Sequence, residues 1–221
     1  MNIGIIGAGN IGSALAYRLV DLGHEVVISN SRGPETLGDV VADTGATAVI
    51  TADAARGRDL VVITIPECRV PDLPDDLFDG VPDDVVVVDT NNYYPRNRDG
   101  RIDAIENGMT ESRWVADRLG RPGIVKAFNN IHAARLRGDG RPAGDPERIA
   151  LPYAGDDAGA KRTVAALIDA LGFDPVDAGS LDDSWRQQPG APCYGTDLGE
   201  TDIRAALAAA PRQRPTDFCA Q

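Results

Sequence analysis

The sequence has few cationic side chains for its 221 residues. Lysine and arginine together number 22 against 34 aspartates and glutamates, and the only lysines are Lys126 and Lys161, so the formal net charge is −12. A surface this acidic repels nucleic acid and anionic membranes, so we expect neither as a partner. Any site for a polyanionic ligand must therefore be built locally, from backbone amides and a few arginines.

Cysteine and long apolar runs are also scarce. Cys68, Cys193 and Cys219 lack the spacing of metal ligands, so neither a zinc site nor a disulfide framework is expected. No apolar run approaches the roughly 20 residues that span a bilayer, and the first residues lack the charge pattern of a signal peptide. These absences predict a cytoplasmic protein.

Histidine occurs only at positions 24 and 132. No Ser/His/Asp, Cys/His or metal-ligating cluster is evident, which argues against nucleophilic and metal-dependent chemistry. His24 falls at an expected helix-to-strand connection, whereas His132 is the one candidate proton donor, with a packed or capping histidine as the alternative. The reaction class that remains is hydride transfer between two stacked redox rings, because this reaction requires mainly that the rings be held close together.

A glycine-rich turn is the strongest signal that is present. An apolar run ends in Gly7-Ala8-Gly9-Asn10-Ile11-Gly12, which opens into a helical pattern that reaches Leu22. This is the Gly-x-Gly-x-x-Gly order of a dinucleotide-binding βαβ unit, in which the helix N-terminus faces the phosphates. Gly7 would permit the tight turn, Gly9 the approach of a pyrophosphate, and Gly12 close packing of helix on sheet. The alternative is a βα turn that binds no nucleotide.

The end of the second expected strand indicates which dinucleotide is bound. NAD sites usually place an acidic residue there, whereas this chain has Ser31 and Arg32. A hydroxyl and a guanidinium can bind a 2′-phosphate by charge-assisted hydrogen bonds, so the pattern favours NADP. The alternative is a solvated turn in which Ser31 caps the following helix.

Apolar runs and helical patterns alternate along most of the chain, which predicts an α/β fold with a doubly wound, mostly parallel sheet of Rossmann type. We expect about eight strands within residues 1–180 and a short extension, 181–221, packed on the same domain either as a lid or as structural packing. After the first strand, the expected strands are 25–29, 46–50, 59–66, 84–92, 124–129, 148–155 and 173–179. Helices are expected at 34–44, 110–119, 158–171 and 200–210, and a loop at 70–81.

Polar residues follow several of these strands and should meet at one edge of the sheet, where such folds bind their cofactors. Simple strand termination and ordinary turn chemistry are the alternatives. We expect the dinucleotide to contact Thr64, Ile65 and Pro66 beside its nicotinamide half, together with Asn91 and Ala127, and the second substrate to contact Asn129, Asn130 and His132.

Five segments together resemble the NADPH-dependent coenzyme F420 reductases, and this similarity is shared by the NADPH-binding domain of the STEAP metalloreductases. The segments are 4–12, 30–35, 64–66, 126–130 and 177–181. The resemblance implies NADP bound by the amides of Gly9, Asn10 and Ile11, with Ser31 and Arg32 on the 2′-phosphate. It also implies a deazaflavin (F420) or flavin (FMN) ring stacked on the nicotinamide, and a homodimer.

One departure from the family pattern lies beside the phosphate site. Members often carry another basic residue just after the Ser-Arg pair, whereas this chain has Glu35 and Thr36. The sequence as a whole predicts an NADPH-dependent oxidoreductase that exchanges hydride with a small-molecule acceptor. Two other readings are an NADPH-binding sensor without turnover, and a reductase of a small imine or carbonyl with His132 as the proton donor.

Overall fold

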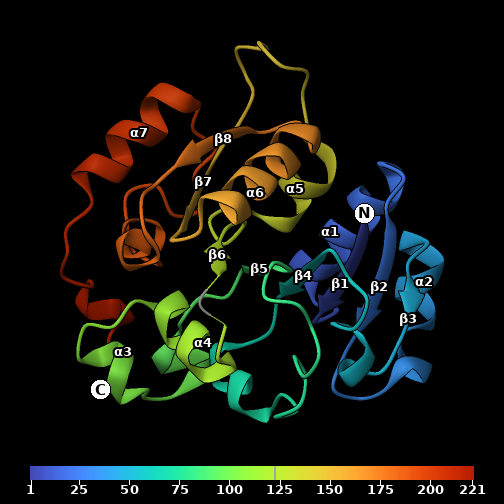
Figure 1. Cartoon of the computed structure of the whole chain (residues 1–221). Helices are drawn as coiled ribbons and strands as arrows, with labels where there is room; N and C mark the ends of the chain where they lie inside the picture. Colours follow the sequence, from blue (N-terminus) through green and yellow to red (C-terminus); the bar gives the residue numbers. More distant parts are fainter. Residues whose placement is uncertain (122) are drawn as a thin grey trace.

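The computed structural model describes residues 1–121 and 123–221 and is organised around one eight-stranded sheet (Figure 1). The strand order is β3-β2-β1-β4-β5-β6-β7-β8, and neighbouring strands run parallel except β6 and β7. This confirms the predicted doubly wound, mostly parallel α/β fold. The strands are β1 (Asn2–Ile6), β2 (Glu25–Ser29), β3 (Thr47–Ala48), β4 (Leu60–Ile63), β5 (Val86–Asp89), β6 (Ile124–Lys126), β7 (Ala150–Gly155) and β8 (Asp174–Asp177).

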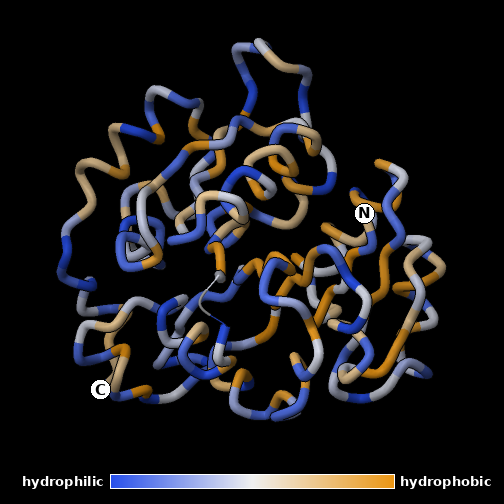
Figure 2. Tube along the Cα trace, in the orientation of Figure 1, coloured by the Kyte–Doolittle hydropathy of each residue, from blue (hydrophilic) through white to orange (hydrophobic). Residues whose placement is uncertain are grey.

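Helices cover both faces of the sheet. One hydrophobic core joins the strands to α1, α5 and α6, and a second joins the opposite face to α4. Figure 2 shows hydrophobic residues along the central strands, as expected for parallel strands buried on both faces. The helices are α1 (Asn10–Asp21), α2 (Gly38–Thr44), α3 (Asp103–Glu106), α4 (Glu111–Leu119), α5 (Ala133–Gly138), α6 (Ala158–Ala170) and α7 (Glu200–Ala209).

Short helical turns account for most differences from the predicted elements. The expected helix 34–44 is divided into a 3₁₀ turn, Pro34–Thr36, and α2, and the third strand has only two residues. A 3₁₀ helix, η3 (Glu67–Asp72), enters the region expected to be a loop. α3, α5 and a further 3₁₀ helix, η5 (Leu181–Gln187), were not predicted, because segments this short carry too few turns to show a helical period.

The C-terminal extension packs against the last two strands. Ile203 and Leu207 of α7 are buried with Ala150 and Val176 from β7 and β8. Arg214, farther along, reaches back to α4, where its Nη1 lies 2.8 Å from Glu111 Oε1. In the part of the chain that the structure describes, no helix is both long enough and apolar enough to cross a membrane.

Lys126 stands at the end of β6 and is fully buried. Its Nζ donates to the Asn91 carbonyl at 2.5 Å and lies 3.4 Å from Glu111 Oε2 and 3.6 Å from Asp89 Oδ2. Burial by itself lowers the pKa of Lys126, but the charges of the two carboxylates outweigh burial and raise the pKa above its ordinary value. A charged ammonium group therefore joins the ends of β5 and β6 to α4.

We expect Lys126→Met to lower the free energy of unfolding by about 3–5 kcal/mol, because Asp89 and Glu111 would remain buried beside a side chain that cannot neutralise them. Urea unfolding measures the loss. Lys161→Met is the matched control, since the Lys161–Asp177 pair (2.7 Å) is partly open to solvent and should contribute no more than about 1 kcal/mol. Equal losses in the two variants would contradict this role for Lys126.

Candidate active site

The predicted glycine turn joins β1 to α1 and packs directly on the segment that follows β4. Gly7 has φ +117°, and a Cβ atom there would lie 2.0 Å from the Thr64 carbonyl oxygen. A Cβ atom at Gly12 would lie 2.0 Å from the Gly7 carbonyl oxygen. The positive φ at Gly7 fits the predicted tight turn and the contact at Gly12 fits the predicted close packing, while the close approach of Gly7 to Thr64 was not predicted.

The N-terminus of α1 has the properties of an anion site. Gly9 is the N-cap residue, no side chain caps the helix, and its first turn contains no acidic residue. A Cβ atom at Gly9 would meet nothing within 4 Å, so the backbone is open to an approaching ligand. Gly9 and Asn10 are exposed and Ile11 is half-buried. Free amides and the positive end of the helix dipole therefore face open space, which fits a pyrophosphate.

The loop after β2 carries Ser31 and Arg32, and both are exposed. Asn30 shapes this loop, because its Oδ1 accepts from the Arg32 amide at 2.9 Å and its Nδ2 donates to Thr36 Oγ1 at 2.9 Å. The alternative in which Ser31 caps the next helix is wrong, since Gly33 is the N-cap residue and no side chain caps that turn. Among the described residues, Arg32 forms no ion pair, so its charge is available to a ligand.

The ends of β4 and β5 are tied together through a side chain. Asn91 is buried, and its side-chain Oδ1 accepts from the Ile65 backbone amide at 3.0 Å, while the Asn91 backbone amide donates to Asp89 Oδ1 at 3.0 Å. Thr64, Ile65 and Pro66 are half-buried. Asn91 thus fixes the position of the Thr64–Pro66 segment, and half of its side-chain amide is already occupied by the protein.

The end of β6 is buried and strained. Ala127 is fully buried in the hydrophobic core, so its side chain does not reach a ligand surface. The next residue, Phe128, has φ +60°, a conformation that bulky side chains rarely adopt and that costs on the order of 1–3 kcal/mol. Strain of this kind persists only where the surroundings impose it, and it often marks functional sites.

This turn directs Asn129 into a hydrogen-bond network with the C-terminal extension. Asn129 Nδ2 donates to the Gln187 carbonyl at 2.7 Å and to Asn92 Oδ1 at 3.0 Å, and Gln187 Nε2 donates to Asn129 Oδ1 at 3.0 Å. The side-chain oxygen and nitrogen of Asn129 are therefore all bonded within the protein. Its side chain positions the strand end against η5.

Asn130 and His132 differ from Asn129 in their surroundings. The Asn130 carbonyl accepts from the Gly195 amide at 3.0 Å, but both side-chain atoms of Asn130 are buried without a partner in the described structure. His132 is exposed and is the N-cap residue of α5, with no side-chain capping bond. Beside them the hydroxyls of Tyr94 and Tyr194 are hydrogen-bonded to each other. Burial is the main cause that raises the pKa of Tyr194, and the hydrogen bond with Tyr94 is the second cause.

Buried polar atoms without a partner gather at this edge of the sheet. The described part of the chain contains ten such side-chain atoms. Two of them belong to Arg58 and Arg148. The others lie in the segments that follow β4, β5 and β6, or in η5 and the residue after it. Native proteins usually satisfy such groups, so a concentration of them indicates water or a polar ligand. The residues are Glu67, Asn91, Asn130, Ser184, Gln187 and Gln188.

Glu67 is the most unusual of these groups. It follows Pro66 directly, it is fully buried, and neither carboxyl oxygen has a hydrogen-bond partner in the described residues. Burial, and after it the negative charge of Asp89, raises the pKa of Glu67 well above its ordinary value of 4.5. A carboxyl group whose neutral form is favoured by burial therefore directly follows the segment that the dinucleotide is expected to contact.

Four of the residues that shape this edge were not predicted, namely Glu67, Lys126, Gln187 and Tyr194. Glu67 and Lys126 did have a signal in the sequence, since each is a charged residue that adjoins an apolar strand. Gln187 and Tyr194 belong to the extension and reach the edge only through tertiary contacts, for which the sequence offers no periodic pattern.

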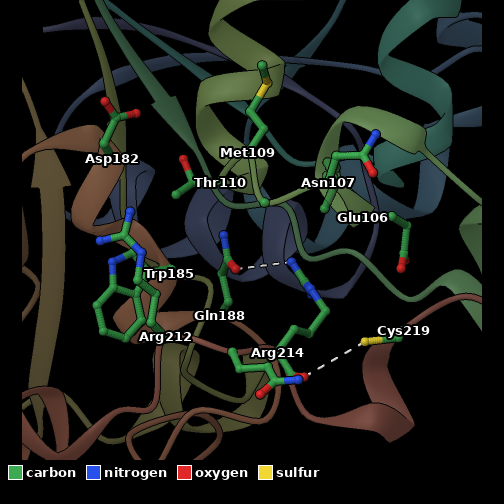
Figure 3. Close-up of a pocket in the computed structure, with 13 residues that line it drawn as sticks. Glu106, Asn107, Met109, Thr110, Asp182, Trp185, Gln188, Arg212, Arg214 and Cys219 are labelled. Carbon is green, nitrogen blue, oxygen red and sulfur yellow. Dashed lines mark hydrogen bonds between the residues drawn. The ribbon is translucent and has the colours of Figure 1, made fainter.

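A separate cavity of about 520 Å³ is lined by three parts of the chain (Figure 3). They are the segment before α4, the helix η5 with the residue after it, and the last residues of the chain. Arg212, Arg214, Trp185 and Glu106 are among its lining residues. Within the described lining, no residue comes from the β1–α1 turn or from the Ser31–Arg32 loop. This cavity is therefore distinct from the predicted dinucleotide site.

Comparison with known proteins adds a family to this geometry. The profile of the family described as "NADP oxidoreductase coenzyme F420-dependent" matches residues 2–93. Over 182 residues, or 81% of this chain, the sequence is 28% identical to the metalloreductase STEAP3 of Rattus norvegicus. The chain spans about a third of the length of the curated relatives it matches, 34% in the case of STEAP3.

Two solved structures are similar over most of the chain. A hypothetical protein, SMa0349, from Sinorhizobium meliloti is 34% identical, with a TM-score of 0.77, over 90% of this chain and 96% of that one. A putative F420-dependent NADP-reductase from Arthrobacter sp. FB24 is 25% identical, with a TM-score of 0.68, over 84% of this chain and 87% of that one. The similarity therefore extends well beyond residues 2–93.

The raised pKa of Glu67 predicts a pH-dependent stability. Between the ordinary and the raised pKa the folded protein binds more protons than the unfolded chain, so stability falls as pH rises through that window. Glu67→Gln removes this titration. Relative to the variant, the wild type should lose stability as the pH rises above the ordinary value of 4.5, by about 1.4 kcal/mol for each pH unit of that window, measured by urea unfolding. Parallel pH profiles for the two proteins would contradict a raised pKa of Glu67.

Proposed function

We propose that this chain, whose residues 2–93 match the profile of the family described as "NADP oxidoreductase coenzyme F420-dependent", transfers hydride between NADP(H) and a deazaflavin or flavin ring. The observation that carries the proposal is the pairing of an open, uncapped α1 N-terminus at Gly9 with the unpaired, exposed Arg32 on the neighbouring loop. Together they provide separate sites for a pyrophosphate and for a 2′-phosphate.

The chain's own residues would bind and orient the dinucleotide. Amides of Gly9, Asn10 and Ile11 would hold the pyrophosphate, and Ser31 and Arg32 would hold the 2′-phosphate by charge-assisted hydrogen bonds. Bound NADP(H) supplies or accepts the hydride. The protein's contribution is to exclude water and to hold two rings at short range, and neither requires a protein acid or base at the reacting carbon.

The second ring would bind at the polar edge formed after β5 and β6. Asn130 and His132 lie there, beside the Tyr94–Tyr194 pair, and the side chain of Asn130 has no protein partner in the described structure. Deazaflavin and flavin rings both present carbonyl and ring-nitrogen groups along one edge, so a buried amide can recognise either. The Asn130 side chain supports a ligand of this chemistry at the edge.

Arg32→Ala tests the cofactor assignment. We expect it to weaken NADPH binding by about tenfold or more and to change NADH binding less than about twofold, because only NADPH carries the 2′-phosphate. Isothermal titration with each dinucleotide measures both affinities. Arg162→Ala, an exposed arginine of α6 that also forms no ion pair in the described structure, is the control. Equal weakening of the two dinucleotides would defeat the 2′-phosphate assignment.

Anaerobic oxidation of NADPH tests the acceptor. The purified protein is mixed with NADPH and with F420, FMN or no acceptor, and loss of NADPH absorbance is followed. We expect turnover well above the acceptor-free rate with at least one ring, and the preferred ring identifies the branch of the family. Tight NADPH binding without turnover on either ring would refute hydride transfer to these rings and favour a binding protein or a reductase of another small substrate.

A further inference from the structure

The cavity of about 520 Å³ in Figure 3 has one lining cation without a partner. Arg212 is exposed and, in the part of the chain that the structure describes, forms neither an ion pair nor a side-chain hydrogen bond. The acidic lining side chains are already engaged. Asp182 Oδ1 accepts from Arg113 Nε at 2.7 Å, and Glu106 Oε1 accepts from the Ala220 amide at 2.9 Å. Figure 3 shows Glu106 on the opposite side of the cavity from Arg212.

A second guanidinium, that of Arg214, is held rigidly in the same cavity. Its Nη1 lies 2.8 Å from Glu111 Oε1, and its Nη2 donates to Gln188 Oε1 at 3.0 Å (Figure 3). The Arg214 side chain is 13% exposed, and Glu111 is fully buried. The position of Arg214 is therefore fixed before any ligand binds, so a ligand that docks beside it orders little additional side chain.

The amide of Gln188 has a partner on only one of its two sides. A guanidinium can only donate, so the amide oxygen faces Arg214 and the amide nitrogen faces away from it, toward Thr110 in Figure 3. Gln188 is 6% exposed, and its Nε2 is buried without an acceptor in the described residues. Buried donors of this kind usually find an acceptor in the protein, in water or in a ligand. The group that is missing here is an acceptor, as a carboxylate oxygen is.

Apolar side chains form much of the remaining wall. Trp185 lies on the same side of the cavity as Arg212, and both also line a smaller cavity of about 30 Å³. Ile105 and Met109 enter from the segment before α4. Arg186 covers one face of the indole, with its guanidinium carbon 4.4 Å from the ring centroid, so a ligand ring would pack on the other face. The volume lies in the range of small-molecule sites.

We propose that this cavity binds a small aromatic carboxylate. The carboxylate accepts from Arg212 and from the Gln188 amide beside Arg214, and the aromatic ring packs against Trp185. A single negative charge fits better than a polyanion, because only one lining cation is unpaired and the two acidic lining side chains repel further negative charge. This site goes beyond hydride transfer, since none of its described lining residues belongs to the proposed dinucleotide site.

The test uses two probes of the same shape, phenylacetate and its uncharged amide, phenylacetamide, titrated calorimetrically into the full chain. We expect the wild type to bind phenylacetate at one site, about fivefold or more tightly than phenylacetamide, because only the anion forms charge-assisted hydrogen bonds. Arg212→Gln should weaken phenylacetate by about fivefold and change phenylacetamide by less than about twofold. Trp185→Leu should weaken both probes by similar factors, because it removes the contact with their common ring.

Arg162→Gln is the matched control and should change neither affinity. Arg162 is an exposed arginine of α6 that forms no ion pair in the described structure and does not line this cavity. Three results would each overturn the proposal: no binding of phenylacetate to the wild type, equal affinities of the wild type for the two probes, or unchanged phenylacetate affinity in Arg212→Gln.

A competition experiment separates this site from the dinucleotide site. Phenylacetate should bind the NADPH-saturated chain within about twofold of its affinity for the free chain, and displacement of NADPH by phenylacetate would overturn the proposal. The titrations of the free chain do not depend on NADPH. A failure of the hydride-transfer proposal therefore leaves their outcome unaffected.

Discussion

The buried ammonium group of Lys126 is the interaction on which the functional edge of the sheet depends. It bonds to the carbonyl of Asn91 after β5 and faces Asp89 and Glu111, and Glu111 in turn pairs with Arg214 of the extension. Burying charged groups costs free energy, and only good geometry offsets this cost. Such a cluster therefore contributes more by fixing one arrangement of the chain than by raising the free energy of unfolding. That arrangement joins two strand ends, α4 and the extension.

Local rules of folding are broken mainly at this same edge. Phe128 adopts a left-handed backbone, Glu67 is a buried acid without a partner, and Asn130 leaves a buried amide unsatisfied in the described structure. Elsewhere the chain is locally consistent, with glycines where φ is positive and an aspartate, Asp157, capping α6. Proteins usually accept such violations where function requires them, and this supports the proposal that a second substrate binds here.

The sequence was sufficient to predict two kinds of feature: strands, which show as apolar runs, and turns whose backbone conformation requires glycine. Long apolar runs predicted the buried strands, and the spacing of Gly7, Gly9 and Gly12 predicted a turn whose close contacts the structure confirms. It was insufficient where tertiary contacts decide the outcome. The bonds between Asn129 and Gln187 join positions 58 residues apart, and the cavity lined by Ser31 from one loop and by Ile65, Pro66 and Arg69 from another forms only when the two loops meet. Residue spacing along the chain contains neither.

The scarcity of lysine has a practical consequence for anyone who labels this protein through its amines. Lys126 is inaccessible in the folded state, which leaves Lys161 as the lysine that acylating dyes, cross-linkers and surfaces can reach. Lys161 belongs to α6 and not to the Ser31–Arg32 loop or to the segments that form the polar edge. Acylation of Lys126 would report that the sheet edge has opened, so the chain carries its own chemical reporter of unfolding.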